Sequence, residues 1–238
     1  MKYHTEFYNK IKGDEQRLRL GEGCPNGCEY CHSDKELISY DIPEIVKNKV
    51  SIMDMNFLYN PKHKERIREL GSKRVNGKVV YYELICGIDW RLLDQETAIL
   101  LKENRFKKIR FAWDYGIELQ YKLKDCYDKL LRAGYKPRNL MCFMLCDWKV
   151  SFNDCLLKLG LLKIWNITVS DCWFDNIKPP NYQCNYWTYI ECKLFRAMCA
   201  LHNQMIKFNI YPDLRRAKRL HKLLNDMKKQ KHLKKEMK

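Results

Sequence analysis

The feature that most constrains the fold is an alternation of short apolar runs with longer amphipathic stretches. The runs, rich in β-branched and aromatic residues, predict strands, and the stretches between them predict helices. The expected strands are 17–23, 50–58, 78–89, 107–114, 139–147 and 163–170, and the expected helices are 61–70, 94–104, 118–134, 152–160 and 188–204. Asp94 and Ser151 stand where the N-caps of two of these helices are expected.

Six strand–helix units in succession predict an α/β protein with a parallel sheet and right-handed crossovers. Several expected strands are nearly continuous apolar runs, which is typical of parallel strands covered on both faces. The periodicity is compatible with an open sheet, a partial barrel or a doubly wound layer. In barrel-like arrangements, the residues that carry chemistry lie at the carboxyl ends of the strands.

Three cysteines follow the first expected strand directly, in the segment CPNGCEYC. Cys24, Cys28 and Cys31 lie on one short loop, with a Pro-Asn-Gly turn between the first two. Thiolates suit zinc, copper or iron–sulfur clusters, and three of them in a polar loop argue against ordinary buried thiols. A structural zinc site needs a fourth ligand, which His32 or a distant cysteine could supply, but no second short-spaced pair is present. A cluster with three cysteine ligands leaves one iron open.

The segment CPNGCEYC, with Tyr30 immediately before the third cysteine, resembles the signature of the radical SAM (S-adenosylmethionine) superfamily. Residues 17–170 resemble the partial (β/α)6 TIM-type barrel of that superfamily. The resemblance implies a 4Fe–4S cluster on Cys24, Cys28 and Cys31, with SAM chelating the fourth iron through its amino and carboxylate groups. One electron, from a donor such as flavodoxin or ferredoxin, would cleave SAM to a 5′-deoxyadenosyl radical that abstracts hydrogen from a substrate.

The end of the second expected strand differs from the superfamily pattern. Many members have a Gly-Gly-Glu stretch there that contacts the SAM amino group, whereas this chain has MDMNF. The resemblance therefore implies that Asp54 and Asn56 contact SAM instead.

The third and fourth expected strands also end in residues that the resemblance assigns to SAM. Gly87, Asp89 and Arg91 resemble a Gly-x-Asp-x-Arg pattern of small radical SAM proteins, in which Arg91 would neutralise the SAM carboxylate. The alternative is a surface turn with a solvated ion pair. Asp114 would lie against the ribose, and Asp147, after the fifth strand, is a weaker candidate for such a contact.

The remaining cysteines are expected mainly to pack in the core. Cys126, Cys142, Cys146, Cys155, Cys192 and Cys199 lie in helical or strand patterns as small apolar residues. An auxiliary cluster on Cys172, Cys184 and Cys192, and a substrate contact by Cys86, are alternatives. The chain has no apolar run of about 18 residues and no apolar segment within residues 1–16, so we expect no membrane span, no signal peptide and a cytoplasmic protein with reduced thiols.

Half of the net charge of +16 lies near the carboxyl terminus, where residues 213–238 carry eleven Lys/Arg and three Asp/Glu. This stretch is expected to be either a solvated helix or an arm that binds phosphates or an acidic partner. Before it, residues 171–191 are rich in aromatic side chains that could close the barrel or stack on bases. We therefore expect a partial-barrel core at 1–170, an aromatic-rich loop and helix packed on it at 171–212, and a basic helical tail at 213–238.

The sequence thus predicts a radical SAM enzyme with an unidentified substrate, for which nucleic acid is the favoured class. One alternative within the same chemistry is an activase that installs a glycyl radical on a partner enzyme. The other is a non-catalytic module in which Cys24, Cys28 and Cys31 bind zinc structurally or support nucleic-acid binding.

Overall fold

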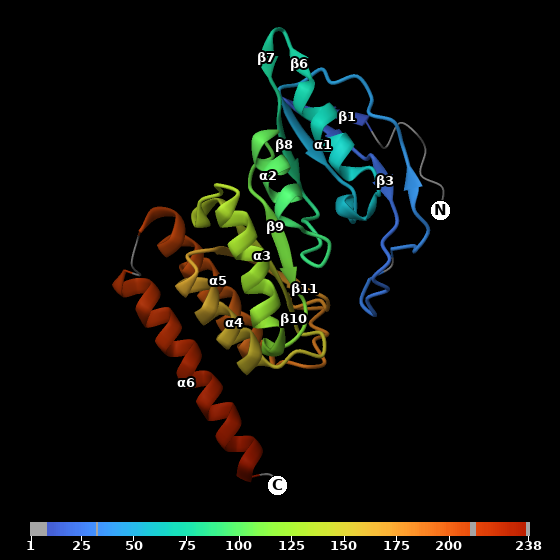
Figure 1. The fold of residues 1–238 in the computed structure, drawn as a ribbon. Helices are drawn as coiled ribbons and strands as arrows, with labels where there is room; N and C mark the ends of the chain where they lie inside the picture. Colours follow the sequence, from blue (N-terminus) through green and yellow to red (C-terminus); the bar gives the residue numbers. More distant parts are fainter. Residues whose placement is uncertain (1–8, 32, 210–212, 237–238) are drawn as a thin grey trace. The chain divides into compact units, whose positions relative to one another are not determined.

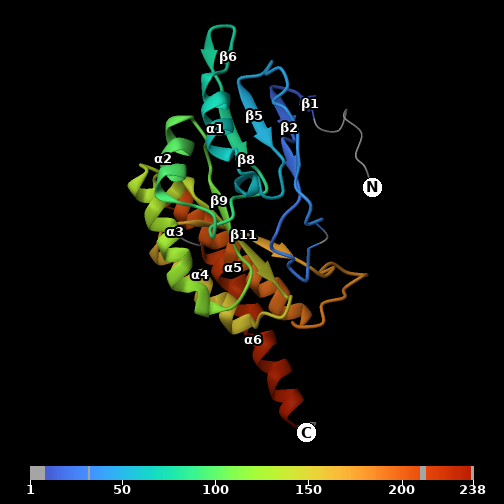
Figure 2. The same cartoon turned by 45° about the vertical axis from the view of Figure 1, so that its right-hand side comes forward.

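The computed structural model describes residues 9–31, 33–209 and 213–236 and shows a mixed α/β protein (Figures 1 and 2). The chain divides into two compact units, residues 1–112 with 121–141 and residues 113–120 with 142–238. Within the described residues there are six α-helices and several sheets, none of which closes into a barrel. The expected segment boundaries at residues 170 and 212 both fall inside the second unit.

The first unit is built on a four-stranded sheet of order β1-β2-β5-β8. Its strands are β1 (Asn9–Lys12), β2 (Glu15–Leu18), β5 (Lys49–Ile52) and β8 (Tyr81–Leu84). β1 and β2 form an antiparallel pair, whereas β2, β5 and β8 run parallel. Leu18 pairs with Ile52 and Ile52 with Leu84, so the three parallel strands end level with one another. Side chains that follow these ends are therefore brought to one edge of the sheet.

Parallel pairing continues past β8 as two isolated bridges, Tyr82 with Phe106 and Ile88 with Phe111. Phe111 belongs to β9 (Arg110–Trp113). Together with β10 (Met141–Cys146) and β11 (Thr168–Trp173), β9 forms a second sheet of order β11-β10-β9. The boundary between the two units passes through β9 and β10.

The observed strands are shorter than the expected ones. The expected strand 17–23 comprises the end of β2 and a separate strand, β3 (Gly21–Glu22), which pairs with β4 (Ile38–Ser39). The expected strand 50–58 ends at Ile52, because the chain then turns into the 3-10 helix η2 (Phe57–Tyr59). The expected strand 78–89 is divided between β8 and a hairpin strand, β7 (Lys78–Val79), which pairs with β6 (Arg74–Val75).

The helices agree closely with the expected ones. They are α1 (His63–Ser72), α2 (Gln95–Glu103), α3 (Gln120–Arg132), α4 (Phe152–Ile164), α5 (Tyr189–Phe208) and α6 (Leu214–Glu236), with short 3-10 helices η3 (Ile117–Leu119) and η4 (Pro137–Asn139). Both expected N-caps are confirmed: Asp94 accepts the backbone N–H of Thr97 at 2.6 Å, and Ser151 accepts that of Asp154 at 3.0 Å. None of the helices in the described part of the chain is long and apolar enough to cross a membrane.

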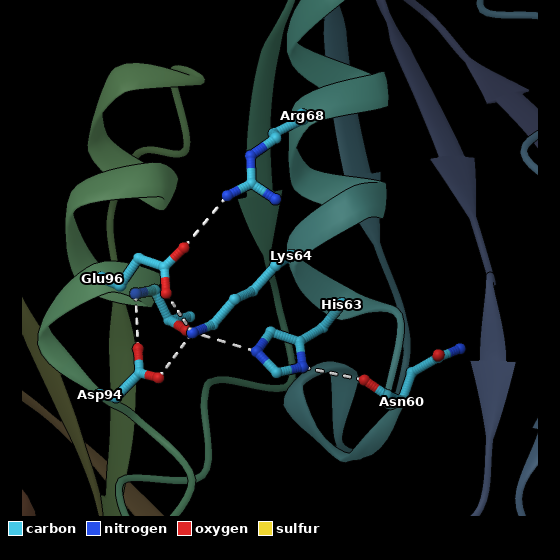
Figure 3. A network of polar contacts seen from close by, with 7 residues as sticks. Asn60, His63, Lys64, Arg68, Asp94 and Glu96 are labelled. Atoms are coloured by element: carbon cyan, nitrogen blue, oxygen red, sulfur yellow. Dashed lines mark hydrogen bonds and ion pairs between the residues drawn. The ribbon is translucent and has the colours of Figure 1, made fainter.

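A polar network joins the first turns of α1 and α2 in the first unit (Figure 3). The Lys64 ammonium lies 2.7 Å from the Asp94 carboxylate and 2.6 Å from the Glu96 carboxylate, and Arg68 contacts the other oxygen of Glu96 at 3.1 Å. His63 contacts the Asn60 carbonyl oxygen at 2.9 Å and the Thr97 hydroxyl at 3.3 Å. The network links the two helices that follow β5 and β8 through partly exposed ion pairs.

The second unit has a core rich in aromatic residues. Trp113 and Trp165 stack with ring centroids 5.8 Å apart, and Trp187 meets Trp173, Phe152 and Phe195 edge to face. Trp187 is 4% exposed. This burial agrees with the packing role expected for part of the aromatic segment 171–191.

Asp54, two residues beyond β5, is buried beneath the chain that leads into the cysteine loop. Its Oδ1 accepts the backbone N–H of Leu20 at 2.7 Å. Burial raises the pKa of Asp54 to about 6, although the backbone N–H groups of Leu20 and Gly21 and the charges of Arg66 and Arg19 favour its ionised form. The contact holds the segment between β2 and β3 in place.

The raised pKa of Asp54 predicts a characteristic pH dependence of stability. An unfolded Asp has a pKa of about 3.9, so the folded state binds the extra proton between roughly pH 4 and 6. The contribution of Asp54 to the free energy of unfolding therefore falls as the pH rises from about 4 to about 6, by about 3 kcal/mol at most. It stays constant at higher pH. Asp54→Asn keeps one acceptor and cannot ionise, so the stability of the variant relative to wild type should rise by that amount from pH 4 to pH 7.

Urea unfolding of both proteins across this pH range measures the difference. Asp125→Asn, which removes an exposed carboxylate of α3, is the matched control and should show no such change. A constant difference between Asp54→Asn and wild type from pH 4 to pH 7 would contradict the assignment.

Candidate cofactor site at the cysteine loop

The cysteine loop, residues 23–34, is shaped by its own backbone. The N–H of Cys24 donates to the Asp34 carbonyl oxygen and that of Cys31 to the Cys28 carbonyl oxygen, both at 2.9 Å. Gly23 has a φ of +92°, and a Cβ there would lie 2.0 Å from the Glu36 carbonyl oxygen, so this position requires glycine. The conformation of the loop is therefore held by its own backbone hydrogen bonds.

The three loop thiols are free and half-buried. All twelve cysteines are unpaired. Within the described residues, the one group of three metal-ligating side chains whose ligand atoms all lie within 4.8 Å is Asp147, Asp175 and Cys184. Cys24, Cys28 and Cys31 do not form such a group. His32, considered as a zinc ligand, lies outside the described residues.

A buried carboxylate, Asp89, connects the loop to the ends of the parallel strands. Its side chain is 4% exposed. Asp89 Oδ2 accepts hydrogen bonds from the side-chain amides of Asn26, at 2.7 Å, and Asn56, at 3.0 Å. Asp89 Oδ1 accepts from Arg91 Nε at 2.6 Å and from the Arg91 backbone N–H at 3.2 Å. Burial alone would raise the pKa of Asp89, but the hydrogen bonds from Arg91 and Asn26 outweigh it and lower the pKa.

Arg91 adds a positive charge beside the thiols. Burial by itself would lower the pKa of its guanidinium, but the Asp89 carboxylate, Cys28 and Cys24 act in the opposite direction and raise it. Its side chain is 41% exposed, and its Nε is engaged by Asp89. The two terminal nitrogens make no hydrogen bond among the described residues, so the guanidinium can bind an anion.

Asn56 lies between the network and the loop. Its Nδ2 is 3.5 Å from Cys24 Sγ as well as 3.0 Å from Asp89. Its Oδ1 is buried and has no hydrogen-bond partner among the described residues. A buried acceptor without a donor is costly, so this oxygen marks a place where a ligand with an N–H or O–H group would be stabilised.

A cleft of about 660 Å³ opens beside the loop. It is lined by Tyr30 and Cys31 from the loop, Met55 after β5, and residues of the β3–β4 region, among them Arg19, Glu22 and Lys35. Met55 is 48% exposed and presents an apolar surface to the cleft. The volume is in the usual range for small-molecule sites.

The structure brings several of the sequence-predicted residues together. Cys24, Asn56, Asp89 and Arg91 form one network, and Gly87, with a φ of +88°, forms the turn that leads to Asp89. The solvated ion pair considered as an alternative does not describe Asp89, because its carboxylate is buried. Asp54 lies apart from this network, beneath Leu20 and Gly21.

Two other candidates belong to the second unit. Asp114 is half-buried, and its charge acts on the buried Lys158. Asp147 is fully buried and accepts the backbone N–H groups of Phe174 and Asp175, both at 3.1 Å. Through these contacts Asp147 holds the loop that follows β11.

The cysteines outside the loop are mostly in the core, as expected. Those that are buried are Cys126, Cys142, Cys146, Cys155, Cys192 and Cys199. Of the three considered for an auxiliary cluster, Cys184 lies beside Cys192, whereas Cys172 contacts the Ser170 carbonyl oxygen at 3.6 Å. Cys86, after β8, is exposed.

Asn26 is not among the residues predicted from the sequence. It lies inside the Pro-Asn-Gly turn between the first two cysteines and was interpreted only as a turn residue, yet its amide makes the shortest contact between the loop and Asp89. A polar amide between two candidate ligand cysteines was the available signal.

A scan against protein-family models finds no family that matches the chain, and a search of curated proteins finds no match either. The interpretation of this site therefore depends on its residues and their geometry.

The Asp89 network predicts that the loop loosens when the carboxylate is replaced. Asp89→Asn should lower the free energy of unfolding by about 1–3 kcal/mol, because a hydrogen bond to a charged group is lost. Alkylation of Cys24 and Cys28 by iodoacetamide, followed by mass spectrometry of the metal-free protein, should become faster. Asp94→Asn is the matched control, since loss of the α2 cap costs about 0.5–2 kcal/mol without touching the loop. Equal labelling rates in the two variants would contradict the coupling.

Proposed function

We propose that this chain is a radical SAM enzyme that holds a 4Fe–4S cluster on Cys24, Cys28 and Cys31. The observation that carries the proposal is the half-buried three-thiol loop, joined through Asn26 to a polar network that also holds Asn56 and Arg91. This network offers both a buried acceptor and a cation next to the thiols.

The number of thiols fits a cluster better than a structural zinc ion. A structural zinc site needs four ligands, and the sequence has no second short-spaced pair beside Cys24, Cys28 and Cys31. A 4Fe–4S cluster on three cysteines leaves one iron open for SAM.

The residues beside the loop suit the polar end of SAM. The guanidinium of Arg91 would bind the SAM carboxylate through its terminal nitrogens, and the unpartnered Oδ1 of Asn56 would accept a hydrogen bond from the amino group. Asp89 orients both side chains, since it holds Arg91 Nε and Asn56 Nδ2. Asp54 has a positioning role, because its carboxylate fixes the chain before the loop.

The strand arrangement supports a partial barrel as the finer fold. β2, β5 and β8 are parallel, and the bridges from Tyr82 and Ile88 extend the parallel order to the β9 segment. The cysteine loop, Asn56 and Asp89 all follow the carboxyl ends of these strands. In barrel enzymes this is the end that carries the chemistry.

When bound, the cluster supplies one-electron reduction of SAM, and SAM supplies the carbon radical that abstracts hydrogen. The residues of this chain would bind and orient these groups, and the cleft beside Tyr30 and Met55 gives access to the loop. The electron donor would be a flavodoxin or ferredoxin, and nucleic acid is the favoured class of substrate.

Iron content tests the ligand assignment. Cys24→Ala, Cys28→Ala and Cys31→Ala should each abolish iron binding and the brown colour of anaerobically purified protein. Cys192→Ala and Cys199→Ala, which remove buried thiols of α5, are the controls and should keep the full iron content. A colourless protein that binds zinc, or equal iron loss in all five variants, would sink the assignment.

SAM affinity tests the pocket. Arg91→Ala and Asn56→Ala should retain iron and weaken SAM binding by roughly 10- to 150-fold, which corresponds to a lost charge-assisted hydrogen bond of about 1.5–3 kcal/mol. Arg68→Ala removes an exposed arginine of α1 and should leave SAM affinity unchanged. The measurement is equilibrium binding of SAM to iron-loaded protein under anaerobic conditions. Unchanged affinity in both pocket variants would refute this pocket while leaving the cluster in place.

A further inference from the structure

Helix α6 carries an exposed basic face. Arg215, Lys218, Arg219, Lys222 and Lys229 share one side of the helix: Arg215, Lys218, Lys222 and Lys229 follow at intervals of three, four and seven residues, and Arg219 lies beside Lys218. All five are exposed. At a rise of 1.5 Å per residue, this basic face extends over about 21 Å.

The apolar side of α6 is turned toward its own unit. Leu220, Leu223 and Met227 are half-buried, and α6 packs against α5. Arg216, on the apolar side, contacts the side chain of Gln204 in α5. Figure 1 shows α6 beside α5, and both views show its carboxyl-terminal part extending away from α5. The helix therefore docks through its apolar side and leaves its basic face to solvent.

The composition of the basic face distinguishes between possible partners. A protein interface is stabilised mainly by buried aromatic and apolar anchors, and this face has none among residues 215–229. A membrane-bound amphipathic helix needs a wide free apolar face, whereas Leu224 is the one exposed large apolar side chain of α6 among residues 215–229. Five exposed cations along one side of the helix, with the carboxylate of Asp226 among them, instead match a polymer with one phosphate per nucleotide along each strand.

We propose that the basic face of α6 binds the phosphate backbone of nucleic acid without reading its base sequence. The inference depends on α6 alone and not on the cluster, since every residue of the proposed cofactor site belongs to the first unit. If both proposals hold, nucleic acid is the substrate class of the enzyme. The helix would retain the polymer near the chain independently of the target nucleotide.

The experiment measures binding of fluorescein-labelled oligo(dT) and of a duplex of mixed sequence to the full-length protein across a salt series. Each phosphate contact contributes about 0.7–0.9 to the slope of log affinity against log salt. The variant changes Arg215, Lys218, Lys222 and Lys229 to Gln, a good helix former, and circular dichroism checks that α6 is retained. The slope should flatten by about three, and the iron content should not change.

A matched control removes the same charge elsewhere in the second unit. It changes four exposed lysines to Gln: Lys163, Lys178, Lys193 and Lys207. This control should keep the wild-type slope. An equal loss in both variants would overturn the proposal, because net charge alone would then account for binding. Tighter binding to polyglutamate or to phosphatidylserine vesicles than to oligonucleotide at equal salt would overturn it in favour of an acidic protein or a membrane.

Discussion

The arrangement of the cysteine loop depends on the buried carboxylate of Asp89. A charge that is 4% exposed is poorly solvated by water and must be satisfied by the protein. Its donors come from the loop, from the chain after β5 and from the turn after β8, so one carboxylate couples three segments. Each such hydrogen bond contributes about 1.5–3 kcal/mol, and the loss of any donor leaves part of the charge unsatisfied.

The helices were predictable from sequence because the interactions that begin them are local. Asp94 and Ser151 each bond to a backbone N–H three residues ahead, and no other part of the chain is needed. The ends of the strands were not predictable in this way. β5 ends at Ile52 because the residues beyond it bind distant partners, Leu20 for Asp54 and Asp89 for Asn56. β1 was missed because all four of its residues are exposed and it has no apolar face.

The residues of the candidate site also differ in how far they could be predicted from sequence. The three cysteines were identifiable because their spacing is a local pattern, and Asp89 and Arg91 because they stand in one short turn. The position of Asn26 between two cysteines was a local signal, but its partner could not be foreseen, since Asp89 lies 63 residues further along the chain. The different surroundings of Asp54 and Asn56, which are two residues apart, could not be foreseen either. Asp54 supports the chain before the loop, whereas Asn56 lies beside Cys24.

The proposed cofactor site and the proposed phosphate-binding face belong to different units of the chain. The residues of the proposed cofactor site, Cys24, Asn26, Asn56, Asp89 and Arg91, all belong to the first unit, and the contacts that join them lie within that unit. The basic face of α6 belongs to the second unit, and its charges are exposed rather than paired within a network. Exposed charges act through screened, salt-dependent attraction, whereas the Asp89 network acts at short range in a desolvated setting. Salt should therefore weaken the binding of a polymer by α6 while leaving the geometry beside the thiols intact.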